Sequence, residues 1–240
     1  MGLVKAAVGD ALLTFMWIIC ASTIGATTSI IANIIGVEGN ASLAITTALI
    51  FLISVLFGFI SDAFGGASFN ATGTVAFYIA GAAGDDDTLM STAVRFPAQA
   101  VGAVGGVLAL MELMPLEYKH MLEGPTLKVD LHTGAIAEGV LTFAITFVVL
   151  LIIIKGPKSF FWKNWMLSVA TMAVIVPGSS YTGPSMNPAN AFGWAYVYNK
   201  HNTWEQFYVY WICPSLGAIL AAWLYRLVFP PRQLSKQKTA

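Results

Sequence analysis

Six long apolar stretches, separated by short polar segments, constrain the fold of this chain more than any other feature. They cover residues 8–32, 43–63, 92–114, 134–154, 163–181 and 205–229. Each has about the 20 apolar residues that a helix needs to cross the hydrocarbon core of a bilayer. Only 10% of the residues are charged, against roughly 25% in soluble domains. The sequence therefore predicts an all-α membrane protein with six transmembrane helices and lipid as its solvent.

The basic residues predict how these helices are oriented. With six spans both termini lie on one side of the membrane. That side holds nine basic residues, and the other side holds three: Lys5, Arg95, Lys155, Lys158, Lys163, Arg226, Arg232, Lys236 and Lys238 against Lys119, Lys128 and Lys200. Because Lys and Arg concentrate in cytoplasmic loops, we expect both termini in the cytoplasm.

Two further segments, 65–81 and 178–198, are apolar and rich in glycine but too short to cross the bilayer. Non-helical backbone at membrane depth is tolerated only where it is buried in protein or lines a wet cavity. Both segments are therefore predicted to enter the membrane and return to the same side.

These segments belong to an internal repeat. Three pairs of motifs match in the same order: residues 10–15 (DALLTF) with 138–143 (EGVLTF), 66–70 (GASFN) with 183–187 (GPSMN), and 102–103 (GA) with 217–218 (GA). The repeats cover about 5–114 and about 133–229 within a single transmembrane domain, 1–240, that ends in a basic tail, 230–240. Each repeat has three spans, so the two insert with opposite topology, as in many transport proteins.

The repeat also aligns two carboxylates, Asp10 and Glu138, inside predicted spans. Charged groups at this depth are costly unless they face the protein interior and find partners. Their equivalent positions favour paired structural roles, in which they accept hydrogen bonds from the backbone of the re-entrant segments. The alternative is a proton relay.

Two asparagines are predicted to begin short helices inside the re-entrant segments. Asn is a preferred N-cap and Pro is favoured at the first helical position, so Asn187 caps a helix from Pro188 to about residue 196, with Ala189 in its first turn. In the first repeat, Asn70 caps a helix over about 71–80 that begins with Ala71 and Thr72. Opposed insertion brings both N-termini, each with about half a positive charge, to the bilayer centre. Such a site repels cations and donates hydrogen bonds to small neutral molecules.

The motifs at residues 182–183 (TG), 187–189 (NPA) and 192–193 (FG) resemble those of the aquaporin (major intrinsic protein) superfamily. Residues 67–70, 119–121 and 186–196 are most similar to the plant small basic intrinsic proteins, first class. The resemblance implies a right-handed bundle of six transmembrane helices with two re-entrant half-helices. It implies a passive channel for water, with small neutral solutes as further candidates, and a homotetramer. Members of that group usually have Pro where this chain has Ala71, which puts the pore geometry in question.

The resemblance also implies a second constriction, formed here by Ile50, Ile175, Pro184 and Asn190. Water-selective relatives usually have Arg at the position of Asn190 and often His at that of Ile175. Isoleucine has no donor and Asn offers an uncharged amide. We therefore expect a more apolar mouth that repels cations less.

The C-terminal tail carries Lys236 and Lys238, the fifth and third residues counted back from Ala240. This spacing resembles a K-x-K-x-x retrieval signal, and the small basic group independently implies the endoplasmic reticulum membrane. The alternative is an ordinary basic flank of a cytoplasmic tail.

Two other functions stay open: a proton-coupled transporter that uses Asp10 and Glu138, and a non-conducting scaffold, suggested by Ala71. An enzyme is not expected, because no nucleophile–base pair or metal-ligand spacing is present, and no cofactor is predicted. A net charge of zero argues against nucleic acid as a partner. The expected partners are water, small neutral solutes and the lipid bilayer.

Overall fold

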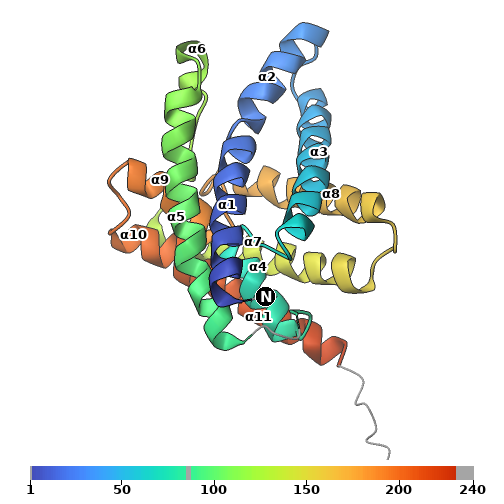
Figure 1. Cartoon of the computed structure of the whole chain (residues 1–240). Coiled ribbons are helices and arrows are strands. Elements are labelled where there is room, and N and C mark those ends of the chain that lie inside the picture. The colour runs from blue at the N-terminus through green and yellow to red at the C-terminus, as the bar shows by residue number, and fades with distance from the viewer. Residues whose placement is uncertain (1, 85–87, 231–240) are drawn as a thin grey trace, which may run out of the picture.

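The structure, a computed structural model, describes residues 2–84 and 88–230. In that part of the chain every regular element is a helix, and the six predicted spans are confirmed (Figure 1). They are formed by α1 (Leu3–Ser22) with α2 (Ile24–Ile35), α3 (Ala41–Ala63), α5 (Leu89–Leu113), α7 (Leu131–Leu150), α8 (Phe160–Gly178), and α10 (Trp204–Phe207) with α11 (Cys213–Val228). The proposed retrieval signal, Lys236 and Lys238, lies outside the described residues.

The first span is broken near its middle. The Thr23 hydroxyl donates to the carbonyl oxygens of Ile19, at 3.2 Å, and Cys20, at 2.9 Å. These bonds satisfy carbonyls at the end of α1 and allow the helix to change direction there. Beyond the break, the hydroxyls of Thr28 and Thr46 lie 3.1 Å apart and join α2 to α3.

Two other spans contain a π-helical turn. In the fourth span Leu151–Lys155 continues α7, and in the sixth span Tyr208–Ile212 connects α10 to α11. The second turn ends two residues before Pro214. Proline has no N–H, and its ring clashes with the carbonyl four residues before it, so the wider π turn accommodates it.

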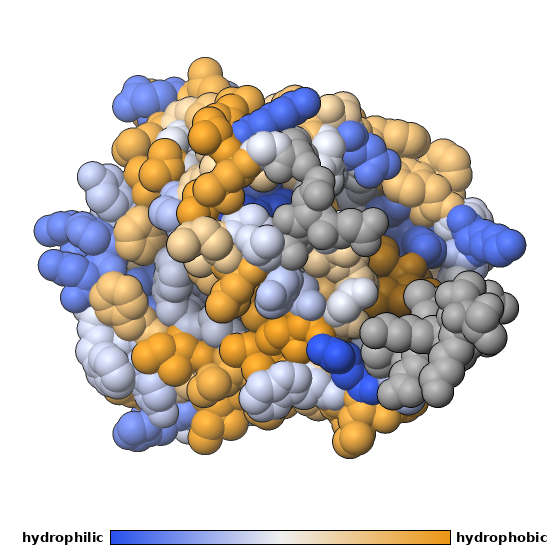
Figure 2. All heavy atoms as spheres, turned by 60° about the horizontal axis from the view of Figure 1, so that its bottom comes forward, coloured by the Kyte–Doolittle hydropathy of each residue, from blue (hydrophilic) through white to orange (hydrophobic). Residues whose placement is uncertain are grey.

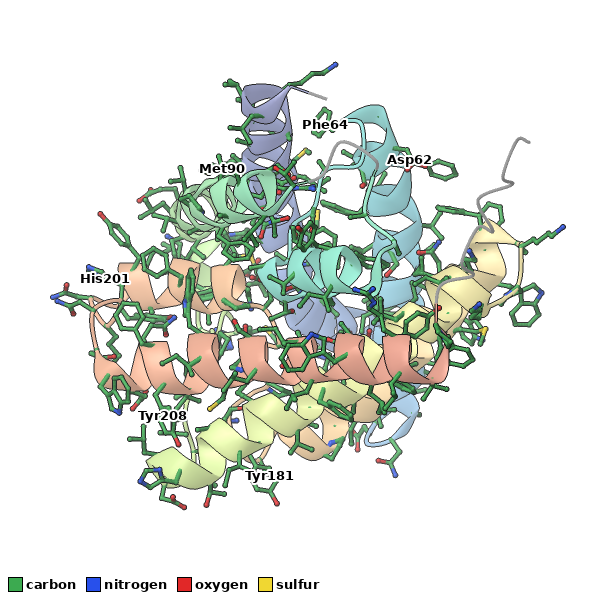
Figure 3. The ribbon with its side chains drawn as sticks, turned by 90° about the horizontal axis from the view of Figure 1, so that it is seen from below. Asp62, Phe64, Met90, Tyr181, His201 and Tyr208 are labelled. Carbon is green, nitrogen blue, oxygen red and sulfur yellow. The ribbon has the colours of Figure 1, made fainter. Side chains whose placement is uncertain are left out.

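Each repeat contains one half-helix, α4 (Ala71–Ala80) or α9 (Pro188–Val197). Both begin at the predicted asparagine. Each packs on the third span of the opposite repeat: α4 lies along α11, as Figure 3 shows from below, and α9 lies along α5. The contact between α9 and α5 is close, because a Cβ on Gly193 would come within 2.8 Å of the Ala103 backbone.

The first and third spans of each repeat also approach closely. A Cβ on Gly102 would overlap the carbonyl oxygen of Ala11, and a Cβ on Gly217 would overlap that of Gly139. Small residues allow such close backbone packing in membrane helices. These two glycines therefore serve equivalent contacts, α1 with α5 and α7 with α11, inside a single chain.

Polarity is arranged for a lipid solvent. Asp10, Gln99 and Glu138 have no exposed surface, whereas the outward faces of the spans carry large apolar side chains. On α11 these are Leu216, Leu220, Trp223 and Leu227. Figure 2 shows apolar residues in broad patches on the face in view. The polar groups that position the site are therefore inside the helix bundle.

A short additional helix, α6 (Leu116–Lys119), follows α5 on the side opposite the chain ends. Figure 1 places the N-terminus and the end of α11 together at the bottom and α6 at the top. We refer to these two sides as the terminal side and the opposite side.

Candidate pore

A cavity of about 900 Å³ passes between the two half-helices. Its lining includes residues 82–84, which precede α5 on the terminal side, and residues 123–126, which follow α6 on the opposite side. Both Asn70 and Asn187 line it between these ends. The cavity therefore links the two sides of the helix bundle past the half-helix N-termini.

Both asparagines cap their half-helices. Asn70 has extended backbone angles, and its Oδ1 accepts a hydrogen bond from the Thr72 N–H at 3.0 Å. Asn187 does the same for the Ala189 N–H at 3.1 Å. Asn70 retains this cap with Ala71, rather than Pro, at the first helical position.

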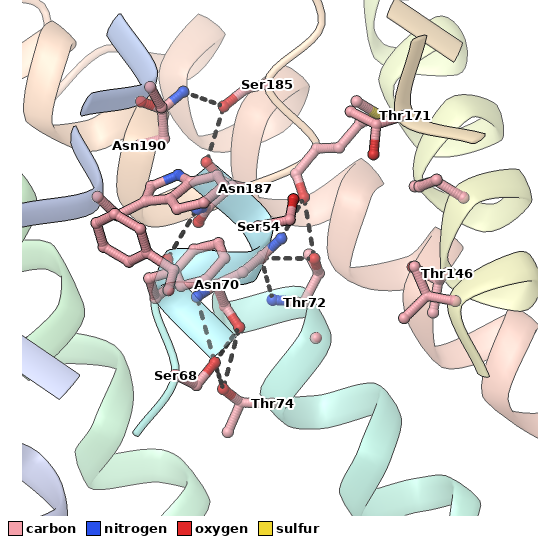
Figure 4. Close-up of a pocket in the computed structure, with 18 of the residues that line it drawn as sticks. Ser54, Ser68, Asn70, Thr72, Thr74, Thr146, Thr171, Ser185, Asn187 and Asn190 are labelled. Atoms are coloured by element: carbon pink, nitrogen blue, oxygen red, sulfur yellow. Dashed lines mark hydrogen bonds between the residues drawn. The ribbon is translucent and has the colours of Figure 1, made fainter. Parts of the chain in front are cut away.

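The same two side chains connect the repeats to each other. Asn70 Nδ2 donates to the Met186 carbonyl at 3.2 Å, and Asn187 Nδ2 donates to the Phe69 carbonyl at 2.8 Å. A side-chain amide has two N–H groups. In the described part of the chain, the second N–H of each asparagine has no protein partner, so both can donate into the cavity (Figure 4).

Thr72 adds a connection that the second repeat lacks. Its hydroxyl lies 2.7 Å from Asn70 Oδ1 and 3.0 Å from the Met186 carbonyl. The equivalent residue, Ala189, has no side chain that could make these contacts. Thr72 therefore ties the start of α4 to the opposite loop. Next to it, Ala71 occupies the position where a Pro would stiffen the turn.

Asp10 is held by one backbone group and two side chains. It accepts hydrogen bonds from the Ser68 N–H at 2.8 Å and from Gln99 Nε2 at 2.8 Å. Arg95 forms a two-pronged ion pair with it, with Nε and Nη2 at 2.8 and 2.9 Å from the two carboxylate oxygens. The bond from the Ser68 N–H is a backbone hydrogen bond from the first re-entrant segment, as expected for a structural role of Asp10.

The sequence predicted Arg95 to be a basic residue that flanks a span, and this prediction of its position was wrong. It is buried within α5, where it also donates to the Gly66 carbonyl at 2.9 Å. Its charge therefore balances that of Asp10 inside the protein, and it is not a free cation at the membrane surface.

Glu138 is bound by neutral donors. It accepts hydrogen bonds from the N–H groups of Ser185, at 2.8 Å, and Met186, at 3.0 Å, and from the Thr182 hydroxyl at 2.8 Å. Within residues 2–84 and 88–230 no cation forms an ion pair with it. It fixes the loop that leads into Asn187.

All four residues of the proposed second constriction line the cavity: Ile50, Ile175, Pro184 and Asn190. Asn190 Nδ2 donates to the Ser185 hydroxyl at 3.1 Å. Next to Asn70, the ring of Trp17 stacks on that of Phe69 at a centroid distance of 3.8 Å, and both line the cavity. This aromatic wall was not predicted.

Three hydroxyl groups also line the cavity, from Ser54 on α3, Thr146 on α7 and Thr171 on α8 (Figure 4). No described residue forms a hydrogen bond with them. Ser54 lies one helical turn from Ile50, and Thr171 lies one turn from Ile175. That spacing from the predicted constriction is the sequence signal that could have found them.

Residues 1–225 match the sequence profile of the major intrinsic protein family. The chain belongs to this family. It is 56% identical to "Aquaporin SIP1-2" of Zea mays, with 97% of each chain covered. It is 57% identical to "Aquaporin SIP1-1" of Oryza sativa subsp. japonica, covering 95% of this chain and 94% of the other. The proposed resemblance to the first class of small basic intrinsic proteins is thereby confirmed.

The helical arrangement is that of a solved member of the same family. The "aquaglyceroporin from Plasmodium falciparum" superposes with a TM-score of 0.73 over 95% of this chain and 98% of that chain. Its sequence is only 16% identical, so this likeness concerns the fold alone. Family and fold together support a passive membrane channel.

Among the described residues, no three His, Cys, Asp or Glu side chains lie close enough to hold a metal ion. Cys20 and Cys213 are free thiols, and each belongs to, or packs against, an apolar cluster. The cavity of this family member is therefore lined by amide, hydroxyl and carbonyl groups and apolar walls, and the charged residues Arg95, Glu123 and Lys128 are also among the lining residues.

Proposed function

We propose that this chain conducts water and small neutral solutes passively through the cavity between its half-helices. The observation that carries the proposal is the pair of Asn caps, Asn70 and Asn187. Each uses one amide N–H to hold the opposite loop and keeps one for the cavity. A neutral molecule with a lone pair can accept these bonds as it passes.

The half-helix N-termini account for the exclusion of ions. Each end carries about half a positive charge, and α4 and α9 bring two such ends to opposite sides of the same cavity. Together they raise the energy of a cation or proton at that depth, whereas a neutral solute is not affected.

The carboxylates have structural roles in this proposal. Both oxygens of Asp10 bind Arg95, and both oxygens of Glu138 bind groups of the second loop. A proton relay needs a carboxylate that can release and regain its proton in contact with solvent. Asp10 and Glu138 are fully buried, so the transporter alternative has less support than the channel.

Selectivity at the second constriction is proposed to be weak toward small neutral solutes. Ile50, Ile175 and Pro184 present apolar groups, and Asn190 adds one uncharged amide. None of these four side chains is a cation. The cavity lining also includes Lys128, whose Nζ donates to the Ser179 carbonyl at 3.1 Å, and the exclusion of positive ions depends further on the half-helix ends. We expect modest water flow with passage of other small uncharged molecules.

Assembly and location are further parts of the proposal. The family resemblance supports a homotetramer with one pore in each chain. The small basic group, together with Lys236 and Lys238, supports the endoplasmic reticulum membrane, with both termini in the cytoplasm. Replacing both lysines by alanine in a tagged full-length chain should move it onward from that membrane if the signal operates.

The conducting pathway can be tested with one vesicle preparation. Purified full-length protein in vesicles is compared by stopped-flow light scattering for water, glycerol, urea and hydrogen peroxide. The variant Thr171→Trp places a large side chain in the cavity wall and should lower the flux of all four. Flux equal to that of protein-free vesicles in the wild type would contradict the proposal.

A further inference from the structure

The Ser185 hydroxyl determines which end of the Asn190 amide faces the cavity. A serine hydroxyl has one proton to donate. Ser185 donates it to the Asn187 carbonyl at 2.8 Å. The group of Asn190 that lies 3.1 Å from Ser185 Oγ must therefore be a donor, which is the amide nitrogen. The hydrogen-bond network thus fixes the orientation of the Asn190 side chain.

This orientation leaves the Asn190 oxygen for the cavity. Figure 4 shows the nitrogen of Asn190 turned toward Ser185. Within the described chain no group donates to Asn190 Oδ1, and Asn190 is one of the residues that line the cavity. The amide therefore offers its acceptor to a passing solute, while one of its donors is engaged with the protein.

The side chains of the other constriction residues add no hydrogen-bond donor. The side chains of Ile50 and Ile175 have no donor, and Pro184 has no backbone N–H either. In the first repeat the residue that follows the Asn cap at the same spacing is Gly73, which has no side chain. The side chains of the constriction thus combine three apolar groups with the oxygen and one remaining N–H of a single amide.

We infer that Ser185 is a positioning residue that makes the outer constriction favour small solutes bearing several N–H donors, of which urea is the test case. This inference rests on the proposed channel function. A urea molecule that enters the constriction gives up part of its hydration, and Asn190 Oδ1 replaces one of the lost acceptors. Its apolar neighbours leave that oxygen without competing protein donors.

The test compares urea and water permeability in vesicles that contain the full-length protein. Asn190→Leu removes the acceptor at similar size and should lower urea permeability about three- to tenfold, as expected for one hydrogen bond, with water permeability changed less than about twofold. Ser185→Ala frees the amide to rotate and should lower urea permeability by a smaller factor. Ser185→Thr keeps a hydroxyl and should restore the wild-type ratio.

The matched control is Ser168→Ala. Like Ser185, Ser168 donates its hydroxyl to a backbone carbonyl, that of Asn164 at 2.8 Å, but Ser168 is fully buried and does not line the cavity. This variant should keep the wild-type ratio of urea to water permeability. A fall of both permeabilities together in Ser185→Ala, or an unchanged urea permeability in Asn190→Leu, would overturn the inference while the channel function stands. Wild-type vesicles without water flux would instead overturn the proposed function, and the inference with it.

Discussion

In each repeat a buried carboxylate holds the re-entrant loop in the equivalent position, but the groups that bind the carboxylate differ. In the first repeat Asp10 is charge-balanced by Arg95 and also bound by Gln99. In the second repeat Glu138 is bound by two backbone N–H groups and a hydroxyl. Arg95 stands seven residues before Gly102, and the residue at the same spacing before Gly217 is Tyr210, whose hydroxyl donates to the Thr182 carbonyl at 3.4 Å. The structure therefore conserves the geometry of the loops across the repeats, and the partners of the carboxylates differ.

The length of each acidic side chain accounts for this difference. Glu138 is one methylene longer than Asp10 and reaches two consecutive backbone N–H groups, those of Ser185 and Met186. Asp10 reaches a single backbone N–H, that of Ser68. Its remaining acceptor capacity must be filled by long side chains from α5. The shorter acid thus depends on a buried cation, whereas the longer one does not.

The largest expected effect comes from breaking the charged network. Arg95→Ala leaves Asp10 buried without its cation, which should lower the free energy of unfolding by about 3–5 kcal/mol. Chemical denaturation in mixed micelles measures it. The control is Arg226→Ala, which removes only an exposed bond to the Ile79 carbonyl and should change stability by less than about 1 kcal/mol. Equal effects of the two variants would contradict the asymmetry.

The next largest effect concerns the close helix contact that both repeats make through a glycine. Gly102→Ala and Gly217→Ala each force a Cβ against the backbone of a neighbouring helix, and each should cost about 3 kcal/mol, the upper part of the range for overpacking. Gly25→Ala on α2, where a Cβ would meet nothing within 4 Å, is the matched control. A large difference between the two repeats in this measurement would show that their helix contacts are not equivalent.

Glu138→Gln should have a smaller effect than Arg95→Ala. The variant keeps one acceptor oxygen but turns an NH₂ group toward an N–H or hydroxyl donor, which costs about 1–3 kcal/mol. No cation loses its partner. Glu112→Gln, an exposed change on α5, serves as the control. If Glu138→Gln preserved stability but abolished a pH-dependent solute flux, the transporter alternative would be favoured.

Ala71→Pro should have the smallest effect. In the structure Ala71 stands at the first position of α4, where the N–H has no helical partner and Pro is well tolerated. The change should stabilise by up to about 1 kcal/mol, through the unfolded state, with water permeability altered less than about twofold. A strong loss of flux would show that Ala71 is needed for the geometry around Thr72.

Features that the repeats share could be predicted from the sequence, because each appears twice. The Asn caps and the positions of Asp10 and Glu138 come from matched motifs, whereas the matched glycines, Gly102 and Gly217, did not show which helices they would contact. Arg95 could not be placed, since a single Arg near a span end is typical of a basic flank. The hydroxyls of Ser54 and Thr171 were missed although each lies one turn from the predicted constriction, because isolated Ser and Thr in membrane helices often bond to neighbouring helices.

The break in the first span at Thr23 was also not predicted. A Thr inside an apolar run gives no pattern that separates it from other threonines of the same helix, such as Thr14. Its effect depends on which carbonyls it meets, Ile19 and Cys20, and the sequence does not specify that. The first span, Leu3–Ile35, is also longer than the predicted stretch, 8–32.

The most direct test of the account measures water flux and proton flux together in vesicles that contain the wild-type protein. An osmotic step gives the water permeability, and a pH gradient with an internal dye gives the proton flux. Water flux above that of protein-free vesicles, with proton flux unchanged, is the predicted result, because the amides of Asn70 and Asn187 admit neutral molecules and the half-helix ends repel cations. Water flux equal to that of the lipid, or a proton flux that rises with it, would contradict the account.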